Sequence, residues 1–221
     1  MRSISGLQAL AFFGLLSISV ATGIYATYFL FGTLPMGDFR GVVLTTLGVV
    51  LVYFFAILVY RIFLTFAPLE NGPITEGSRE EFSYHVYLLF YLILFQPLTR
   101  SLLLPVPLMR VIYIGLGAKL GANSYSAGTI LDPPLTTIGN NCIIGHDAVF
   151  FSHAVEGQRL SLAAIVVGNN VTIGANSVIQ PGVVIEDNAI VAVNAVVSKG
   201  THIGKGEVWG GTPARCIRRD N

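Results

Sequence analysis

One aliphatic residue recurs at every sixth position through the C-terminal part of the chain. The column comprises Val167, Ile173, Ile179, Ile185, Val191, Val197 and Ile203. Four places after each of the first six stands a small or β-branched residue, namely Val171, Ser177, Val183, Ala189, Ala195 and Thr201. A period of two would describe a single strand, whereas a sustained period of six requires one short unit copied side by side. The pattern therefore predicts a solenoid whose triangular coils take about 18 residues each and stack at about 4.8 Å.

The same spacing is present upstream of a break. Its positions are Ile114-Gly115, Leu120-Gly121, Ile138-Gly139, Ile144-Gly145 and Phe150, with interruptions at Ser126 and Asp132. The column from Val167 is offset from these positions, so the segment from Phe151 to Val166 is an insertion in the repeat. It contains one histidine and several polar residues. Because functional residues often lie on loops that a rigid scaffold positions, we expect the functional site here.

The N-terminal part of the chain is too apolar for an ordinary soluble domain. The sequence is 53% hydrophobic and only 11% charged, and no charged residue occurs from Leu7 to Gly32 or from Gly41 to Tyr60. Each stretch reaches the length of about 20 residues that crosses a hydrocarbon core of about 30 Å. We therefore predict a two-span transmembrane helical hairpin in residues 1–68. A cleaved signal peptide is the alternative for the first stretch, although this stretch is longer than the apolar region of a typical signal peptide.

Residues 69–113 are expected to connect this anchor to the repeat. They begin with a polar linker, "LENGPITEGSREE", and continue with an apolar segment that Pro97, Pro105 and Pro107 interrupt. The apolar core is short for a span, so we expect an interfacial or re-entrant helix. A third membrane crossing is the alternative, and it would move the repeat to the other side of the membrane.

Basic residues indicate the orientation of the anchor. Arg2 precedes the first apolar stretch, and others follow the second: Arg61, Arg79, Arg100, Arg110 and Lys119. Positive residues near membrane helices favour the cytoplasmic side. We expect an integral protein of a bacterial inner membrane, with membrane lipid as a partner and the repeat domain on the cytoplasmic side.

Charge and cysteine content argue against two other kinds of protein. The formal net charge is +1, which gives no electrostatic support for a nucleic-acid partner. Cys142 and Cys216 lie far apart and form no metal motif. We therefore expect neither a disulfide framework nor a bound metal.

Three stretches together resemble a known family. They are the hexads, the insertion "FFSHAVEGQRL" and the closing "GGTPARCIR". Over about Gly115 to Arg218 the chain resembles the hexapeptide-repeat acyltransferases, especially the maltose, galactoside and serine acetyltransferases, in a membrane-anchored variant. The resemblance implies a mixed fold, in which the transmembrane hairpin and interfacial helix precede a left-handed parallel β-helix in residues 114–221. It also implies a homotrimer with active sites between neighbouring prisms, where an acyl group moves from a thioester to a hydroxyl or amine.

The resemblance also assigns roles to residues near the insertion. His153 occupies the position of the family's general base, and an imidazole with a pKa near about 6.5 can accept a proton from an attacking hydroxyl. Asp132 matches an aspartate of the acetyltransferases and is expected to contact the acceptor, with a turn residue before Pro133 as the alternative. Tyr125 stands where relatives that acetylate sugars often carry an acceptor-binding asparagine, which disfavours a simple soluble sugar.

Other polar residues of the insertion and the remaining histidines are assigned more broadly. Glu156, Gln158 and Arg159 either orient the base and bind the acceptor or only solvate the loop. The other histidines are expected to have structural, interfacial or solvated roles: His85, His146 and His202.

Donor-binding candidates lie along the later coils. By the same resemblance, the backbone of four residues flanks the pantetheine arm of acetyl-CoA or another acyl thioester: Gly174, Ala175, Val193 and Asn194. Lys199 and Arg215 are candidates for binding the nucleotide phosphates or an acidic acyl carrier protein. Binding of anionic lipid headgroups is the alternative for these cations.

The leading hypothesis is a membrane-anchored O- or N-acyltransferase with a lipid-linked or saccharide acceptor. Two alternatives share the fold. A non-catalytic trimeric scaffold would only organise membrane helices. A γ-type carbonic anhydrase would need three histidines around Zn²⁺, and only His146 and His153 are near each other in sequence.

Overall fold

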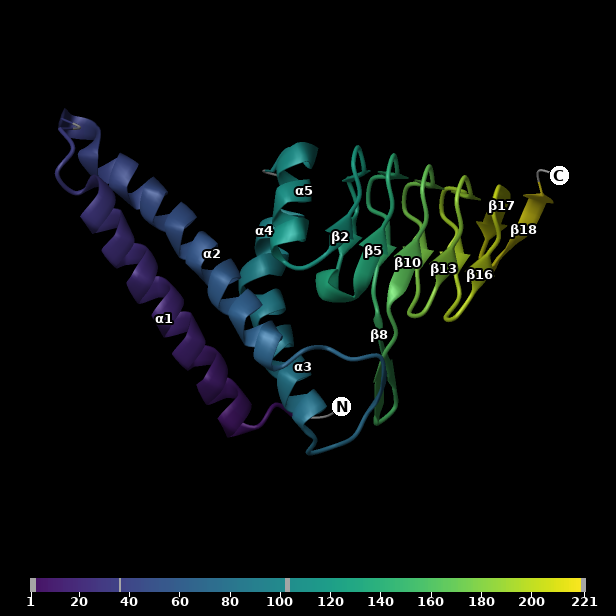
Figure 1. Cartoon of the computed structure of the whole chain (residues 1–221), viewed down its shortest axis with the longest axis horizontal. Coiled ribbons are helices and arrows are strands. Elements are labelled where there is room, and N and C mark those ends of the chain that lie inside the picture. The colour runs from purple at the N-terminus through teal and green to yellow at the C-terminus, as the bar shows by residue number, and fades with distance from the viewer. Residues whose placement is uncertain (1–2, 36, 102–103, 220–221) are drawn as a thin grey trace.

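The computed structural model describes residues 3–35, 37–101 and 104–219. Figure 1 shows a group of N-terminal helices beside a stack of short strands that runs to the C-terminus. Arg2, which contributed to the predicted orientation, lies outside the described residues.

The short strands form three faces of a prism. The first face contains β2 (Lys119–Leu120), β5 (Thr136–Ile138), β10 (Ile165–Val167), β13 (Val184–Ile185) and β16 (His202–Ile203). The second contains β3 (Tyr125–Ser126), β6 (Ile143–Ile144), β11 (Thr172–Ile173), β14 (Ile190–Val191), β17 (Glu207–Gly211) and β18 (Ala214–Arg219). The third contains β4 (Thr129–Ile130), β7 (Val149–Phe150), β12 (Val178–Ile179) and β15 (Val196–Val197). All these pairings are parallel except that of β17 with β18, so the domain is a parallel β-helix closed by a hairpin.

The six-residue column forms the core of this prism, as predicted. Every member from Val167 to Ile203 is at most 2% exposed. Residues of the column pair with one another from coil to coil, for example Ile138 with Val167 and Val167 with Ile185. Each six-residue unit therefore forms one short strand and the corner that follows it.

Asparagine and glycine turn the corners. The third residue after a column residue has a positive φ, as in Asn170, Asn176, Asn188 and Asn194 (φ 55 to 61°) and in Gly182 and Gly200. This left-handed conformation is costly for most side chains and tolerated by asparagine and glycine. The corners thus use the residue types that the backbone requires.

The start of the repeat differs from the predicted spacing. Ile114 and Gly115 belong to helix α5 (Val106–Gly115), and the coils begin at Lys119. Ser126 keeps the register because it is buried and pairs with Ile144. The irregularity lies on both sides of β4: four positions separate Ser126 from Ile130, and eight separate Ile130 from Ile138, so the corner where Asp132 precedes a 3₁₀ turn (Pro133–Leu135) is widened. Local helix contacts at Ile114 and this wider corner produced the mismatch with strict six-residue counting.

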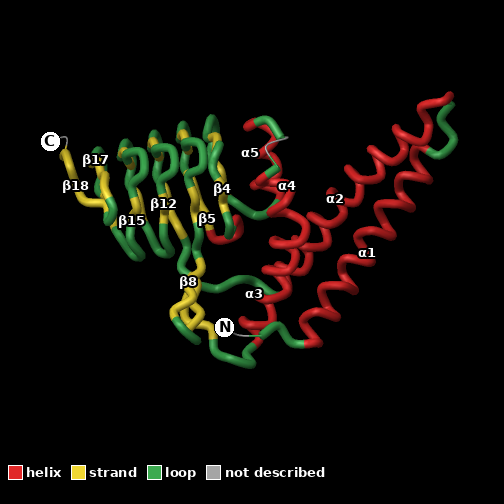
Figure 2. Tube along the Cα trace, turned by 180° about the vertical axis from the view of Figure 1, so that it is seen from behind, coloured by secondary structure: helices red, strands yellow, loops and turns green. Residues whose placement is uncertain are grey.

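The insertion forms a hairpin that leaves the prism at one corner. Strand β8 (His153–Glu156) pairs antiparallel with β9 (Arg159–Leu162), and β9 pairs with β1 (Gly72–Ile74) of the linker. Figure 2 shows this hairpin projecting from the stack toward helix α3 (Arg79–Phe90).

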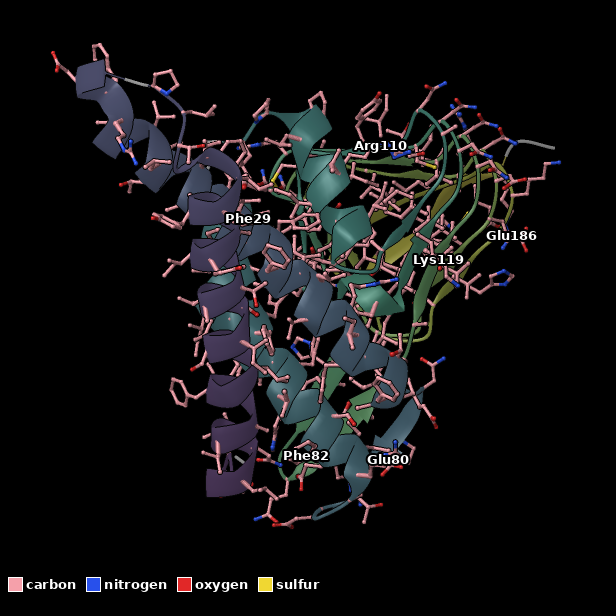
Figure 3. The ribbon with its side chains drawn as sticks, turned by 60° about the vertical axis from the view of Figure 1, so that its left-hand side comes forward. Phe29, Glu80, Phe82, Arg110, Lys119 and Glu186 are labelled. Carbon is pink, nitrogen blue, oxygen red and sulfur yellow. The ribbon has the colours of Figure 1, made fainter. Side chains whose placement is uncertain are left out.

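Two long helices, α1 (Gly6–Phe31) and α2 (Arg40–Phe66), lie side by side at the other end of the molecule (Figure 1). Gly23 permits close contact, because a Cβ atom there would lie 2.7 Å from Val52. Most of their apolar side chains are exposed or partly exposed. Phe29 on α1 lies on the opposite side of the view from Glu186 on the coils (Figure 3). Both helices are long and apolar enough to cross a membrane.

A third helical segment lies between these helices and the prism. It runs through α3, a π-helical turn η2 (Tyr91–Phe95) and α4 (Gln96–Arg100), and α5 then leads into β2. From Arg79 to Arg100 it too is long and apolar enough to cross a membrane. The repeat domain holds both ends of the segment, because β1 precedes it and β2 follows it.

Truncation of a column residue tests this core. Ile179→Ala should lower the free energy of unfolding by about 2–5 kcal/mol, because it leaves a cavity among fully buried residues. Ile143→Ala is the matched control, since Ile143 is 63% exposed on the outer side of a strand, and it should cost no more than about 0.5 kcal/mol. Denaturant unfolding of both detergent-solubilised variants gives the comparison. Equal losses would contradict the assignment of inner and outer positions.

Candidate active site

His153 stands at the point where the insertion leaves the prism. It is the first residue of β8, and its Nδ1 atom lies 2.7 Å from Oδ2 of Asp132. The two residues occupy the same corner of consecutive coils, one after β4 and the other after β7. The stacking of coils therefore brings together two side chains that are 21 positions apart.

Asp132 is buried and bonded through both carboxylate oxygens. Its side chain is 2% exposed. Oδ2 also accepts a hydrogen bond from the backbone N–H of Ser152 at 2.7 Å. The hydroxyl of Tyr87, from helix α3, lies 3.2 Å from Oδ1 and donates to the carbonyl oxygen of Leu131 at 2.7 Å. These contacts hold the carboxylate in one position beneath the histidine.

This environment sets the protonation of His153. Burial alone lowers the pKa of the imidazole, but the hydrogen bond that His153 donates to Asp132 and the negative charge of Asp132 outweigh burial, so the pKa lies above its ordinary value. An ionised carboxylate only accepts hydrogen bonds, so Nδ1 carries a proton. In the neutral ring, Nε2 is then an acceptor, which is the form a general base requires.

A cavity of about 330 Å³ adjoins the histidine, between the helices and the insertion. The helices contribute Tyr84, Leu88, Tyr91, Leu92 and Gln96, and the insertion contributes Val155, Gln158, Arg159 and Leu160. We call this cavity the helix–insertion pocket. The side chain of His153 is 27% exposed, and its ring lies 6.3 Å from that of Tyr84 between centroids. A substrate in the pocket would lie beside the histidine.

The structure separates the predicted acceptor-binding residues. Gln158 and Arg159 line the helix–insertion pocket, whereas Glu156 is exposed and pairs with Lys199 at 3.1 Å. Asp132 also borders the pocket, and its buried carboxylate is engaged with His153; its contact with the acceptor stays a prediction. Tyr125 lies outside the pocket on β3, where the guanidinium of Arg110 stands 6.0 Å from its ring centroid.

The predicted donor-binding residues lie at a different corner from His153. Gly174 and Ala175 follow β11, Val193 and Asn194 follow β14, and the backbone N–H of Asn194 donates to the carbonyl oxygen of Ala175 at 3.0 Å. The third face of the prism separates this corner from the histidine. Lys199 lies at the histidine's own corner, and Arg215 lies on the terminal strand β18. Within one chain, only Lys199 of these six approaches the insertion.

Several residues that line the pocket were not expected from the sequence. Tyr84 and Tyr91 line the pocket, and Tyr87 between them contacts Asp132; the spacing of three and four residues places all three on one side of a helix. His85 is buried, with Nδ1 3.0 Å from Oε1 of Gln8, so its expected solvated role is wrong. The tyrosine spacing was a usable signal, but it did not reveal which element the tyrosines face.

The remaining histidines are distant from this pair in the described chain. His146 lies 3.2 Å from Asp147 at an exposed corner, and His202 lies 3.0 Å from Glu186 with its side chain exposed on β16. Among residues 3–35, 37–101 and 104–219, no group of three His, Cys, Asp or Glu side chains could hold a metal ion.

Comparisons with known proteins agree with this fold. Residues 164–199 match the family described as bacterial transferase hexapeptide (six repeats). A galactoside acetyltransferase solved in complex with coenzyme A is 24% identical, with a TM-score of 0.52 over 68% of this chain and 88% of its own. A hexapeptide-repeat acetyltransferase from Vibrio cholerae O1 biovar eltor, solved with acetyl-CoA, is 23% identical, with a TM-score of 0.50 over 71% and 97%. No curated protein matches the chain. The repeat domain therefore has the hexapeptide-repeat β-helix fold.

Removal of the carboxylate charge tests the electrostatics of the pair. Asp132→Asn should lower the pKa of His153, because burial then acts without the opposing charge. Nuclear magnetic resonance titration of isotope-labelled histidines measures this, and the exposed His202 in the same spectra is the internal control. An unchanged His153 pKa in the variant would contradict the assigned contact.

The same pair makes stability depend on pH. Because the folded-state pKa of His153 lies above its unfolded value near about 6.5, the pair's contribution is complete below that value and is lost as pH rises through the folded-state pKa. In Asp132→Asn this loss of stability on the alkaline side should disappear. Thermal unfolding over a pH series measures it.

Proposed function

We propose that the chain is a membrane-anchored O- or N-acyltransferase that moves an acyl group from a thioester to a hydroxyl or amine. The observation that carries the proposal is the His153–Asp132 pair beside the helix–insertion pocket. A buried carboxylate that fixes an imidazole is the arrangement of a general base. A non-catalytic scaffold would not need such a pair, so the structure favours the enzyme.

The residues suit the following chemistry. Nε2 of His153 accepts the proton of the acceptor hydroxyl or amine as its oxygen or nitrogen attacks the thioester carbonyl carbon. Asp132 stabilises the resulting imidazolium. When the tetrahedral intermediate collapses, the carbon–sulfur bond breaks and the imidazolium returns the proton to the leaving thiolate. The products are the acylated acceptor and a free thiol, and the histidine is regenerated.

The donor is proposed to be acetyl-CoA, another acyl-CoA or an acyl carrier protein. Coenzyme A and acetyl-CoA are the ligands of the two structurally similar acetyltransferases. The donor-binding candidates around Gly174 and Asn194 lie across one prism face from His153. We therefore propose a homotrimer, in which the donor-binding corner of a second copy completes the site.

The helices are proposed to anchor the enzyme in a bacterial inner membrane. Helices α1 and α2 would cross the bilayer, and their exposed apolar side chains support this placement. Because the repeat domain holds both ends of the α3–α5 segment, we propose that this segment is re-entrant and does not make a third crossing. The repeat domain then lies on the cytoplasmic side, where thioester donors are available.

Two histidine variants test the reaction. Wild-type protein in detergent should release free thiol from acetyl-CoA when native membrane lipid extract is the acceptor. His153→Ala should reduce this rate by about 10²–10⁴-fold. His202→Ala is the matched control, because His202 pairs with Glu186 on β16, away from the pocket and from the donor-binding corner, and it should retain the wild-type rate. Similar losses in both variants, or no release by the wild type with any acceptor, would refute the proposal.

A further inference from the structure

We infer that the acceptor is a membrane amphiphile whose apolar chain lies in the helix–insertion pocket, with its hydroxyl or amine at Nε2 of His153. This inference rests on the proposed function and specifies its substrate class. It also makes α3 and η2, which are outside the repeat, part of the acceptor site.

The first argument is the chemistry of the pocket wall. Leu88 and Leu92 of the helices face Val155 and Leu160 of the insertion across the pocket. A free saccharide would leave these apolar surfaces without matching contacts, whereas an alkyl chain would remove them from water. Polar side chains come from both walls: His85 and Gln96 from the helices, and Gln158 and Arg159 from the insertion hairpin. An amphiphile would place its alkyl chain against the apolar side chains and its polar group near the polar ones.

The second argument is the position of the pocket along helix α1. Ile4, just before α1, lines the pocket, and Gln8 in its first turn contacts His85. The exposed apolar band of α1 begins at the same level, with Leu7 and Leu10. Figure 2 shows that the β8 hairpin lies near this same end of α1. If α1 crosses the membrane, His153 at the start of β8 therefore lies at the level of the lipid headgroups.

The third argument is the π-helical turn. Tyr91 and Leu92 of η2 line the pocket, and the next residue, Ile93, does not. Leu92 lines the pocket and is also 45% exposed, so the pocket borders the exposed apolar surface at this residue, whereas Ile93 is 49% exposed and lies outside the lining. Single π-helical turns are rare and often occur at functional sites. The border provides a route by which a chain in the bilayer enters the pocket laterally.

Photolabelling tests occupancy independently of acyl transfer. The full chain is reconstituted in vesicles of phosphatidylethanolamine and phosphatidylglycerol that carry a diazirine on one acyl chain, and adducts are mapped by mass spectrometry. We expect adducts on β8 and β9, at residues such as Leu160, in wild type and in His153→Ala. Leu92→Trp should reduce these adducts several-fold by filling the pocket, and Val155→Trp should do the same from the opposite wall. Ile93→Trp is the matched control and should leave them unchanged.

The outcomes separate this inference from the proposed function. Adducts confined to α1 and α2, with none on β8 or β9, would overturn the inference even if thiol release is normal. Adducts on β9 without thiol release from any acceptor would support binding of a lipid chain in the helix–insertion pocket and would refute the proposed acyl transfer.

A chain-length series gives a second test in the active enzyme. Among alkyl glucosides offered as acceptors, kcat/KM should rise by up to about fourfold for each methylene that enters the pocket. Leu92→Trp should flatten this dependence, and Ile93→Trp should keep it. Equal kcat/KM for methyl and octyl glucoside would show that the acceptor is recognised without its chain and would overturn the inference.

Discussion

The rest of the structure depends on the burial of one aliphatic residue per strand inside a narrow prism. Each such residue stacks on its counterparts in the coils above and below, so a shift at one coil would expose the core of its neighbours. The prism therefore tolerates irregularity only at corners. Two irregular corners occur in consecutive coils at the same edge, around Asp132 and at the insertion from Phe151 to Val166. The candidate site is built from these two departures.

The buried carboxylate of Asp132 is the electrostatic centre of the site. A buried charge without partners would be strongly destabilising, and here His153, the Ser152 N–H and Tyr87 surround it. The hydrogen bond between Asp132 and His153 is short, and it involves the imidazole that is proposed to act as the base. The contact with Tyr87 comes from a helix outside the repeat, so the position of α3 is linked to the geometry of the base.

Docking of the helices onto the prism uses the insertion as a bridge. Strand β1 of the linker extends the insertion hairpin to three strands, and Oδ1 of Asn71 accepts a hydrogen bond from the backbone N–H of Ala164. The hydroxyl of Tyr91 donates to the carbonyl oxygen of Ile130, and that of Tyr60 donates to the carbonyl oxygen of Leu116. Tyrosines from the helices thus satisfy one backbone carbonyl in the first coil and one just before it. The interface between the helices, the insertion and the prism encloses the helix–insertion pocket beside His153.

The amino-acid sequence alone was sufficient to predict the coils, the insertion, the two long apolar helices and the position of His153. These features are periodic or local, because burial on a repeated unit and length in an apolar stretch leave direct signals in the residue order. The partner of His153, the burial of His85 and the tyrosine-lined pocket could not be predicted in this way. Asp132 had been assigned to the acceptor, and it contacts the base because the widened corner and the insertion stack in space. Such contacts depend on which elements pack together, and distances along the chain do not encode them.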